Sequence, residues 1–99
     1  MTITKNKTGD KLVLALEGQL DTSTAPQLQA ELIPEFDNIH YIELDFEKLQ
    51  YVSSAGLRVL LVGEKKAKAN GGKMILVNIS PEIKEVFEMT GFSGILTIE

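Results

Sequence analysis

The chain has 99 residues, 43% hydrophobic and 24% charged, which is the composition of an ordinary folded domain. A formal net charge of -4 with only 10 basic residues gives no positive field for a run of phosphates, so direct binding to nucleic acid is not expected. Without cysteine there is no disulfide framework or thiolate metal site, and no apolar run approaches the ~20 residues that cross a bilayer. We therefore expect one domain over residues 1–99, in the cytoplasm and without membrane insertion.

The first part of the chain predicts a hairpin followed by a helix. Lys11–Glu17 is an apolar run of strand length, and Thr2–Lys5 can pair with it across a turn at Gly9-Asp10. Asp21–Thr24 offers capping side chains for a helix with Pro26 in its first turn. The apolar residues of this helix recur at a spacing of three and four. They are Leu28, Leu32, Ile33 and Phe36. Pro34 is expected to kink or end the last turn, because it lacks a backbone donor.

The middle of the chain predicts a strand and a second helix. Tyr41–Phe46 alternates apolar and acidic residues, which indicates a strand with one covered face. A helix is predicted from Ser53 or Ser54 to about Asn70, where Gly71-Gly72 ends it. Its expected buried side is Leu57, Leu60, Leu61 and Val62, and its expected solvent side is Glu64, Lys65, Lys66 and Lys68.

The last part predicts a strand, a helix and a final short strand. Lys73–Asn78 is a continuous apolar run, typical of a strand covered on both sides. Ser80 precedes Pro81 as a cap, and Gly91 is the expected helix stop. The residues expected to point inward are Ile83, Val86, Phe87 and Met89. With a short strand at Ile95–Ile98, the order predicts an α/β domain with a mixed, mostly parallel sheet of four to five strands and helices packed chiefly on one face.

The sequence contains few of the residue patterns that an enzyme would need. The single histidine, His40, lies at the entrance of a strand, and no G-x-S-x-G turn is present, so a serine nucleophile has no evident base. Asp45 and Glu47 are spaced as one face of a strand, without a cluster of metal ligands around them. We therefore expect a binding protein with no catalytic residue, no cofactor and no metal.

Small residues gather at the turn before the second helix. The stretch Leu49–Leu61 (LQYVSSAGLRVLL) places Ser53, Ser54, Ala55 and Gly56 where a strand gives way to a helix. A serine at a helix N-terminus normally caps it, for about 1 kcal/mol. Ala55 and Gly56 leave the turn without bulky side chains, so the backbone of another protein could approach closely.

This turn resembles that of the STAS domain of anti-sigma factor antagonists, in which an apolar residue is followed by Asp or Ser, Ser, Ser or Ala, Gly and Leu. Gly18–Asp21 and Thr24–Pro26 resemble the first loop and helix start of that family, and the order of elements agrees over nearly the whole chain. The resemblance implies that the second serine, Ser54, is the phosphoacceptor. Ser53 stands where some members have Asp, and Arg58 where some have a small residue.

The resemblance also implies a function. An anti-sigma factor antagonist in its unphosphorylated form binds an anti-sigma factor and releases the sigma factor, and phosphorylation at Ser54 switches this binding off. The implied partners are an anti-sigma factor that is also a serine kinase of the histidine-kinase-like ATPase type, and a serine phosphatase. ATP belongs to the kinase. The alternative is a STAS binding module that serves a membrane transporter or a stress-signalling scaffold, which fold alone does not separate.

A phosphate on Ser54 would add about -2 charge beside the positive end of a helix, so the fold itself should tolerate it. Arg58 lies four residues further on, on the same helical face, where it could reach that phosphate or simply be an exposed residue. Asp21 and Thr22 follow a parallel strand and should lie at the same end of the sheet, although Asp21 could serve only as a cap. The predicted partner-binding residues are Asp21, Thr22, Ser53, Ala55, Gly56 and Arg58.

Overall fold

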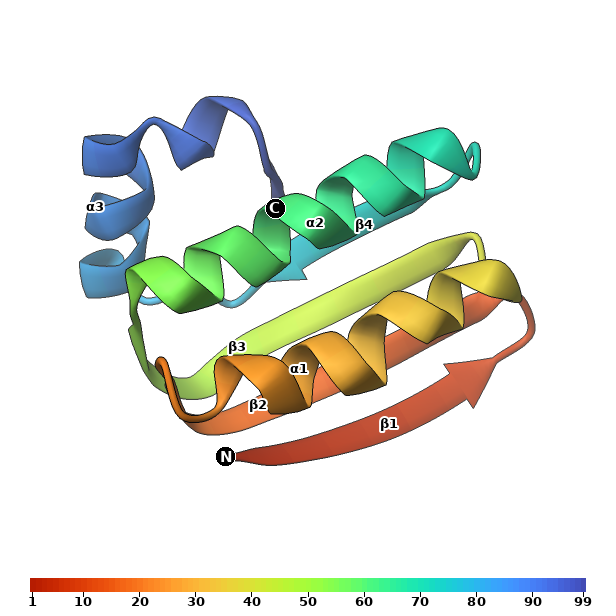
Figure 1. Cartoon of the computed structure of the whole chain (residues 1–99), viewed down its shortest axis with the longest axis horizontal. Helices are drawn as coiled ribbons and strands as arrows, with labels where there is room; N and C mark the ends of the chain where they lie inside the picture. Colours follow the sequence, from red (N-terminus) through yellow and green to blue (C-terminus); the bar gives the residue numbers. More distant parts are fainter.

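Alternating apolar residues build a five-stranded sheet whose strand order follows the chain, and the computed structural model describes every residue from Met1 to Glu99. The strands are β1 (Thr2–Thr8), β2 (Lys11–Leu20), β3 (Tyr41–Val52), β4 (Lys73–Val77) and β5 (Thr97–Ile98). β1 pairs antiparallel with β2, and each later neighbour pairs in parallel. Figure 1 labels β1 to β4, which lie side by side in chain order. The expected α/β class with a mixed, mostly parallel sheet is confirmed.

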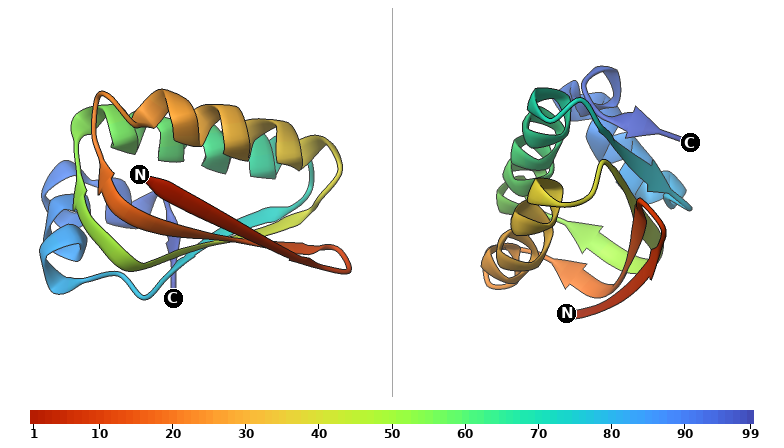
Figure 2. Two further views of the ribbon diagram at one scale, coloured as in Figure 1. Left: turned by 90° about the horizontal axis from the view of Figure 1, so that it is seen from below. Right: turned by 90° about the vertical axis from the view of Figure 1, so that its right-hand side faces the viewer.

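Two parallel helices cover one face of this sheet. They are α1 (Ala25–Leu32), continued by the 3-10 helix η1 (Ile33–Asp37), and α2 (Ser54–Ala69). Figure 2 shows both on the same side of the sheet, while α3 (Pro81–Thr90) stands at one end of it and is followed by η2 (Phe92–Gly94). Phe87 of α3 meets Phe46 of β3 edge to face, with ring centroids 6.3 Å apart. None of these helices combines the length and the apolar character that crossing a membrane requires.

The core lies between the sheet and the helices α1 and α2, and α3 adds Ile83 and Phe87 to it. It is one cluster of 23 buried hydrophobic residues. Leu14, Leu44 and Leu76 are neighbours in register across β2, β3 and β4, and all three are completely buried. Burial of each such side chain contributes roughly 2 kcal/mol, so this layer holds the sheet and the helices in one rigid arrangement.

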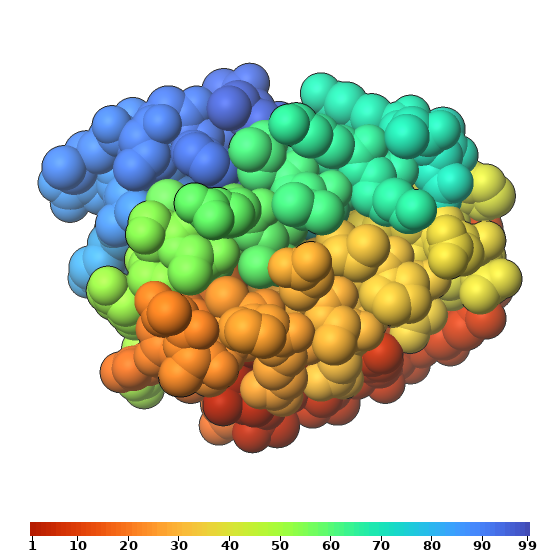
Figure 3. All heavy atoms as spheres, in the orientation of Figure 1, coloured from red at the N-terminus to blue at the C-terminus, as the bar shows by residue number.

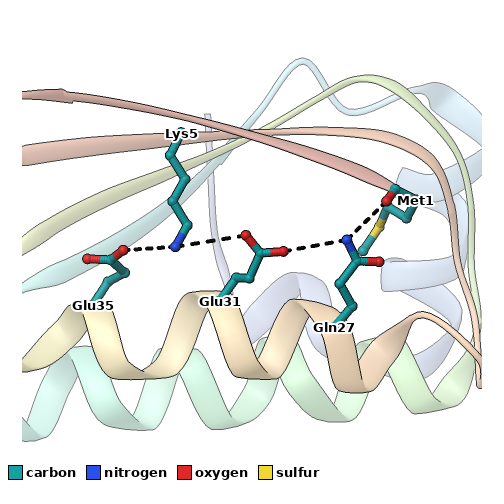
Figure 4. Close-up of polar contacts among 5 residues, drawn as sticks. All are labelled: Met1, Lys5, Gln27, Glu31 and Glu35. Carbon is teal, nitrogen blue, oxygen red and sulfur yellow. Dashed lines mark hydrogen bonds and ion pairs between the residues drawn. The ribbon is translucent and has the colours of Figure 1, made fainter.

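Polar contacts hold the edge strand β1, with Met1 before it, to α1 and η1 (Figure 4). The Lys5 ammonium lies 2.9 Å from a Glu35 carboxylate oxygen and 3.9 Å from one of Glu31. Gln27 donates a hydrogen bond of 3.0 Å to the backbone carbonyl of Met1. Because the charged side chains are still 30–36% exposed, each ion pair contributes at most about 1 kcal/mol and mainly orients the strand.

At the opposite end from the start of α2, the turn that follows α2 packs against the backbone that leads into β3. Lys73 donates its backbone N–H to the carbonyl of His40 at 2.7 Å. A Cβ atom on Gly72 would lie 2.1 Å from that carbonyl oxygen, so the approach admits no side chain. His40 in turn donates its backbone N–H to the carboxylate of Asp10, which joins this turn to the β1–β2 hairpin.

The strands β2 and β3 run further than predicted. β2 continues past Glu17 to Leu20, and β3 continues past Phe46 to Val52. Their pairing shifts register between Ala15 and Glu17 and again between Gly18 and Gln19. Such irregularities interrupt the alternation of apolar and polar residues, which is the signal that sequence reasoning follows along a strand.

The prediction that β4 is covered on both sides is wrong. Met74 and Leu76 are buried under the helices, whereas Ile75 and Val77 are only half-buried on the other face. Figure 2 shows that no helical layer lies against that second face. The apolar run therefore has one covered side.

Three helical residues lie on other faces than predicted. Met89 is 79% exposed, because α3 packs at the end of the sheet and buries only Ile83 and Phe87. Val62 is 37% exposed, and Glu64 is buried. Glu64 follows the buried Leu60 by one helical turn, and its carboxylate has one oxygen 3.7 Å from Lys68 and the other without a hydrogen-bond partner. The spacing of four residues from Leu60 is the sequence signal that could have predicted the burial of Glu64.

The predicted ends of α1 and α3 and the cap of α3 agree with the structure, whereas Thr24, the N-cap of α1, makes no side-chain cap hydrogen bond. α1 ends at Leu32, two residues before Pro34, and η1 then buries Phe36. The Ser80 hydroxyl caps α3 by accepting the Ile83 N–H at 3.2 Å, and Gly91 ends that helix with a left-handed φ of 81°.

Candidate functional site

Two strand ends bring two loops together at one end of the sheet. Leu20 of β2 and Val52 of β3 are opposite each other in the parallel pair. The backbone N–H of Ser53 donates a hydrogen bond of 2.8 Å to the carbonyl of Leu20. The loop that contains Thr22 therefore lies beside the first turn of α2, and the prediction that both lie at the same end of the sheet is confirmed.

A groove runs between the N-terminal halves of α1 and α2, which meet on the face of the molecule seen in Figure 3. Its volume is about 600 Å³, and small side chains form most of its walls. The lining residues are Thr22, Ala25, Pro26, Gln29, Ala30, Ser54, Ala55, Arg58 and Val59. They include one charged side chain, that of Arg58, and no histidine or carboxylate. A serine hydroxyl in this groove consequently has no neighbouring base within it.

Ser53 is the N-cap of α2. Its backbone is extended, with φ of -93° and ψ of 175°, and its hydroxyl oxygen accepts the N–H of Gly56 at a long 3.4 Å. The residue is half-buried. The hydroxyl of Ser53 therefore serves the helix start, as caps usually do.

Ser54 is the first residue of α2, and its side chain is exposed at the groove. Its hydroxyl takes part in none of the chain's side-chain hydrogen bonds, in contrast to that of Ser53. The structure thus separates two adjacent serines by role, and only the second leaves its oxygen free for another molecule.

Gly56 does not lie bare at the surface as expected. It is buried, and a Cβ atom at this position would lie 2.6 Å from Cγ of Leu20 and 3.1 Å from the Leu20 carbonyl oxygen. The absence of a side chain lets α2 begin directly against the end of β2. Gly56 therefore sets the position of Ser54, while its neighbour Ala55 is half-buried and lines the groove.

Arg58 lies one helical turn after Ser54 and is exposed at the rim of the same groove. It forms none of the chain's ion pairs, although Lys66 and Lys68 of the same helix pair with Asp37 and Glu64. Its guanidinium is therefore available to a ligand.

Asp21 organises the loop that presents Thr22. Its carboxylate accepts hydrogen bonds from the Ser23 hydroxyl at 2.7 Å, the Ser23 N–H at 2.9 Å and the Thr24 N–H at 3.1 Å. The hydrogen bond from the Ser23 side chain is the main cause that holds the pKa of Asp21 below its ordinary value of 3.8. Asp21 does not line the groove, whereas Thr22 does.

This lowered pKa predicts a pH dependence of stability. Because the folded state favours the charged carboxylate of Asp21, its stabilising contribution is complete above the ordinary pKa and is lost as the pH falls below about 4. Asp21→Asn should therefore be less stable than the wild type at pH 7, and the difference should shrink below pH 4. Thermal unfolding of both proteins from pH 7 to pH 2.5 checks this, and a difference that is constant across the range would contradict it.

The strand order, the helix pair on one face and the free serine at the start of α2 define a small α/β binding domain. The model of the STAS domain family matches residues 2–99, and the chain belongs to this family. The resemblance recognised in the sequence is confirmed.

The relatives agree with this assignment. BtrV of Bordetella bronchiseptica, a provisionally named anti-sigma factor antagonist, is 36% identical over 99 residues, which cover 99% of this chain and 85% of BtrV. The anti-sigma-B factor antagonist of Bacillus subtilis is 29% identical over 83 residues, covering 84% of this chain and 76% of that protein. A solved structure of the Bacillus cell fate determinant SpoIIAA in the phosphorylated form has a TM-score of 0.78 and 25% identity, covering 99% of this chain and 91% of that one.

Proposed function

We propose that this protein is an anti-sigma factor antagonist whose binding to its partner is switched off by phosphorylation of Ser54. In its unphosphorylated form it binds an anti-sigma factor, and the sigma factor is released. The observation that carries the proposal is the hydroxyl of Ser54, which is exposed beside a groove of small side chains and makes no hydrogen bond within the chain. The names of the relatives and the phosphorylated form of SpoIIAA support it.

The partner is an anti-sigma factor that is also a serine kinase of the histidine-kinase-like ATPase type. It binds ATP and transfers the γ-phosphoryl group to the oxygen of Ser54, and ADP leaves. The proton of the hydroxyl goes to a base of the kinase, because the groove itself holds no carboxylate or imidazole. A serine phosphatase hydrolyses the phosphate ester and resets the switch. This chain needs no cofactor of its own.

The docking surface combines the groove with the two loops at its end. Thr22, Ala55 and Arg58 line the groove and can contact the partner directly, and Ser53 lies next to them at the start of the helix. Asp21 and Gly56 contribute indirectly. Asp21 holds the loop that contains Thr22 by hydrogen bonds, and Gly56 lets the start of α2 pack closely against Leu20. Small side chains at such a surface allow the backbone of the partner to approach closely.

Phosphorylation acts on the partner rather than on the fold. The phosphate would lie at the N-terminus of α2, where the helix dipole stabilises negative charge by roughly 0.3–1 kcal/mol. The same charge, about -2 at pH 7, obstructs a partner surface that packs over the unmodified turn. The switch therefore changes affinity without unfolding the domain.

The test is phosphorylation in vitro. The chain is incubated with ATP and each candidate anti-sigma kinase from the same genome, and the phosphate is located by mass spectrometry. Wild type and Ser53→Ala should be modified, and Ser54→Ala should not. Transfer to Ser53 alone would overturn the site, and no transfer by any candidate would favour a STAS module that serves a transporter or a signalling scaffold.

A further inference from the structure

We propose that Arg58 binds the phosphate on Ser54 within the same chain, so that modification also fixes an arginine side chain along the α2 wall of the groove. The inference rests on the proposed function, because it concerns the state in which Ser54 is phosphorylated. It adds a change in the shape of the docking surface to the change in its charge.

The geometry brings the two groups together. Ser54 and Arg58 are four residues apart in α2, where Cβ atoms of such pairs lie about 5–6 Å from each other. Both side chains are exposed and line the same groove. A phosphate extends Ser54 toward solvent, and the flexible arginine stem spans the remaining distance. The planar guanidinium then donates two parallel hydrogen bonds to phosphate oxygens.

Arg58 is also the available cation at this place. It is the one charged side chain in the groove lining, and it has no ion pair to give up. Along α2, Lys66 and Lys68 are engaged by Asp37 and Glu64.

Lys65 carries the remaining positive charge of α2. It is exposed and forms no ion pair, but it lies about 16 Å further along the helix axis at 1.5 Å per residue. That distance exceeds the Debye length of roughly 8 Å in physiological salt, so its charge is screened from Ser54.

No acidic group of the protein competes for Arg58. The groove lining contains no carboxylate. The carboxylate of Asp21, in the adjoining loop, accepts hydrogen bonds from Ser23 and Thr24 instead. A phosphate on Ser54 therefore meets a free guanidinium, and the resulting charge-assisted pair fixes the arginine along the α2 wall of the groove, where it changes the surface offered to a partner.

The experiment uses protein with phosphoserine incorporated at position 54 during translation, so that it requires no kinase. The titration midpoint of the phosphate is followed by ³¹P NMR between pH 4 and pH 8 in the wild-type background and in Arg58→Gln. A phosphoserine titrates near pH 6. We expect the midpoint to be lower by about 0.5 pH units when Arg58 is present, because a cation favours the dianion. Arg58→Lys should recover part of this shift.

Lys65→Gln is the matched control. It removes the same charge from the same helix, and Lys65 lies on nearly the same helical face as Ser54, three turns away. It should leave the midpoint within about 0.1 pH units of the wild type, because of the screening described above. Equal titration of wild type and Arg58→Gln, or an equal effect of Lys65→Gln, would overturn the proposal.

The outcomes separate this inference from the proposed function. If kinases modify Ser54 but the titration of its phosphate does not depend on Arg58, the proposed function stands and the pairing of Arg58 with the phosphate is refuted. A phosphate that responds to Arg58 in a chain that no kinase modifies would leave the geometry intact and overturn the proposed function. Because Arg58 is exposed, Arg58→Gln should unfold at the same temperature as the wild type, which excludes misfolding as the cause of a changed titration.

Discussion

Ser54→Asp is expected to weaken binding of the anti-sigma factor by about 100-fold while leaving the thermal stability of the free protein nearly unchanged. An uncompensated charge in a docked surface costs several kcal/mol, and about 2.7 kcal/mol corresponds to 100-fold in Kd. Within the free protein the same carboxylate is exposed at the N-terminus of α2, where negative charge is favoured. Titration calorimetry with the partner and thermal unfolding of the free variant measure the two effects.

Ser53→Ala is the control, and it is expected to affect stability more than binding. It removes the cap that accepts the Gly56 N–H, at a cost of about 1 kcal/mol. The melting temperature should fall by roughly 4–8 °C for a domain of this size, while the loss of affinity for the partner at 25 °C stays far smaller than the loss of about 100-fold expected for Ser54→Asp. If Ser54→Asp lost much stability and still bound its partner, Ser54 would be a structural residue and not the switch.

Gly72→Ala is expected to destabilise the domain by about 3 kcal/mol, although it adds only a single methyl group in the turn that follows α2. Its Cβ atom would lie 2.1 Å from the carbonyl oxygen of His40 and 2.8 Å from the carbonyl carbon. Both atoms are backbone, so rotation of a side chain cannot relieve the overlap. The turn must move away, and the hydrogen bond from Lys73 to His40 at the start of the β3–β4 pair lengthens with it.

Two other glycines serve as controls for this prediction. Gly94→Ala meets no atom within 4 Å and has no left-handed φ, so its stability should stay within about 0.5 kcal/mol of the wild type. Gly71→Ala also meets open space, but its φ of 73° penalises a Cβ by roughly 1–2 kcal/mol. Urea unfolding should therefore rank the variants Gly94, Gly71 and Gly72 in order of increasing loss. A Gly72→Ala protein as stable as Gly94→Ala would refute the close approach of Gly72 to the backbone of His40.

Sequence reasoning succeeded where a few neighbouring residues decide the local structure. The Ser80-Pro81 start and the Gly91 stop of α3 follow from capping and backbone chemistry within single turns. The Thr22 loop and the start of α2 share one end of the sheet because β2 and β3 are parallel, which the alternation of strands and helices already required.

By itself, the amino-acid sequence determined the α/β class, the order of the elements and the serine pair at the start of α2. Tertiary structure alone decided that Ser53 caps the helix while Ser54 stays free, that Gly56 is covered by Leu20, and that Arg58 lines a groove with a second helix. The reason is physical. Capping and periodicity act over a few adjacent residues, whereas exposure, close approach and the walls of a groove depend on which distant segment the fold brings alongside.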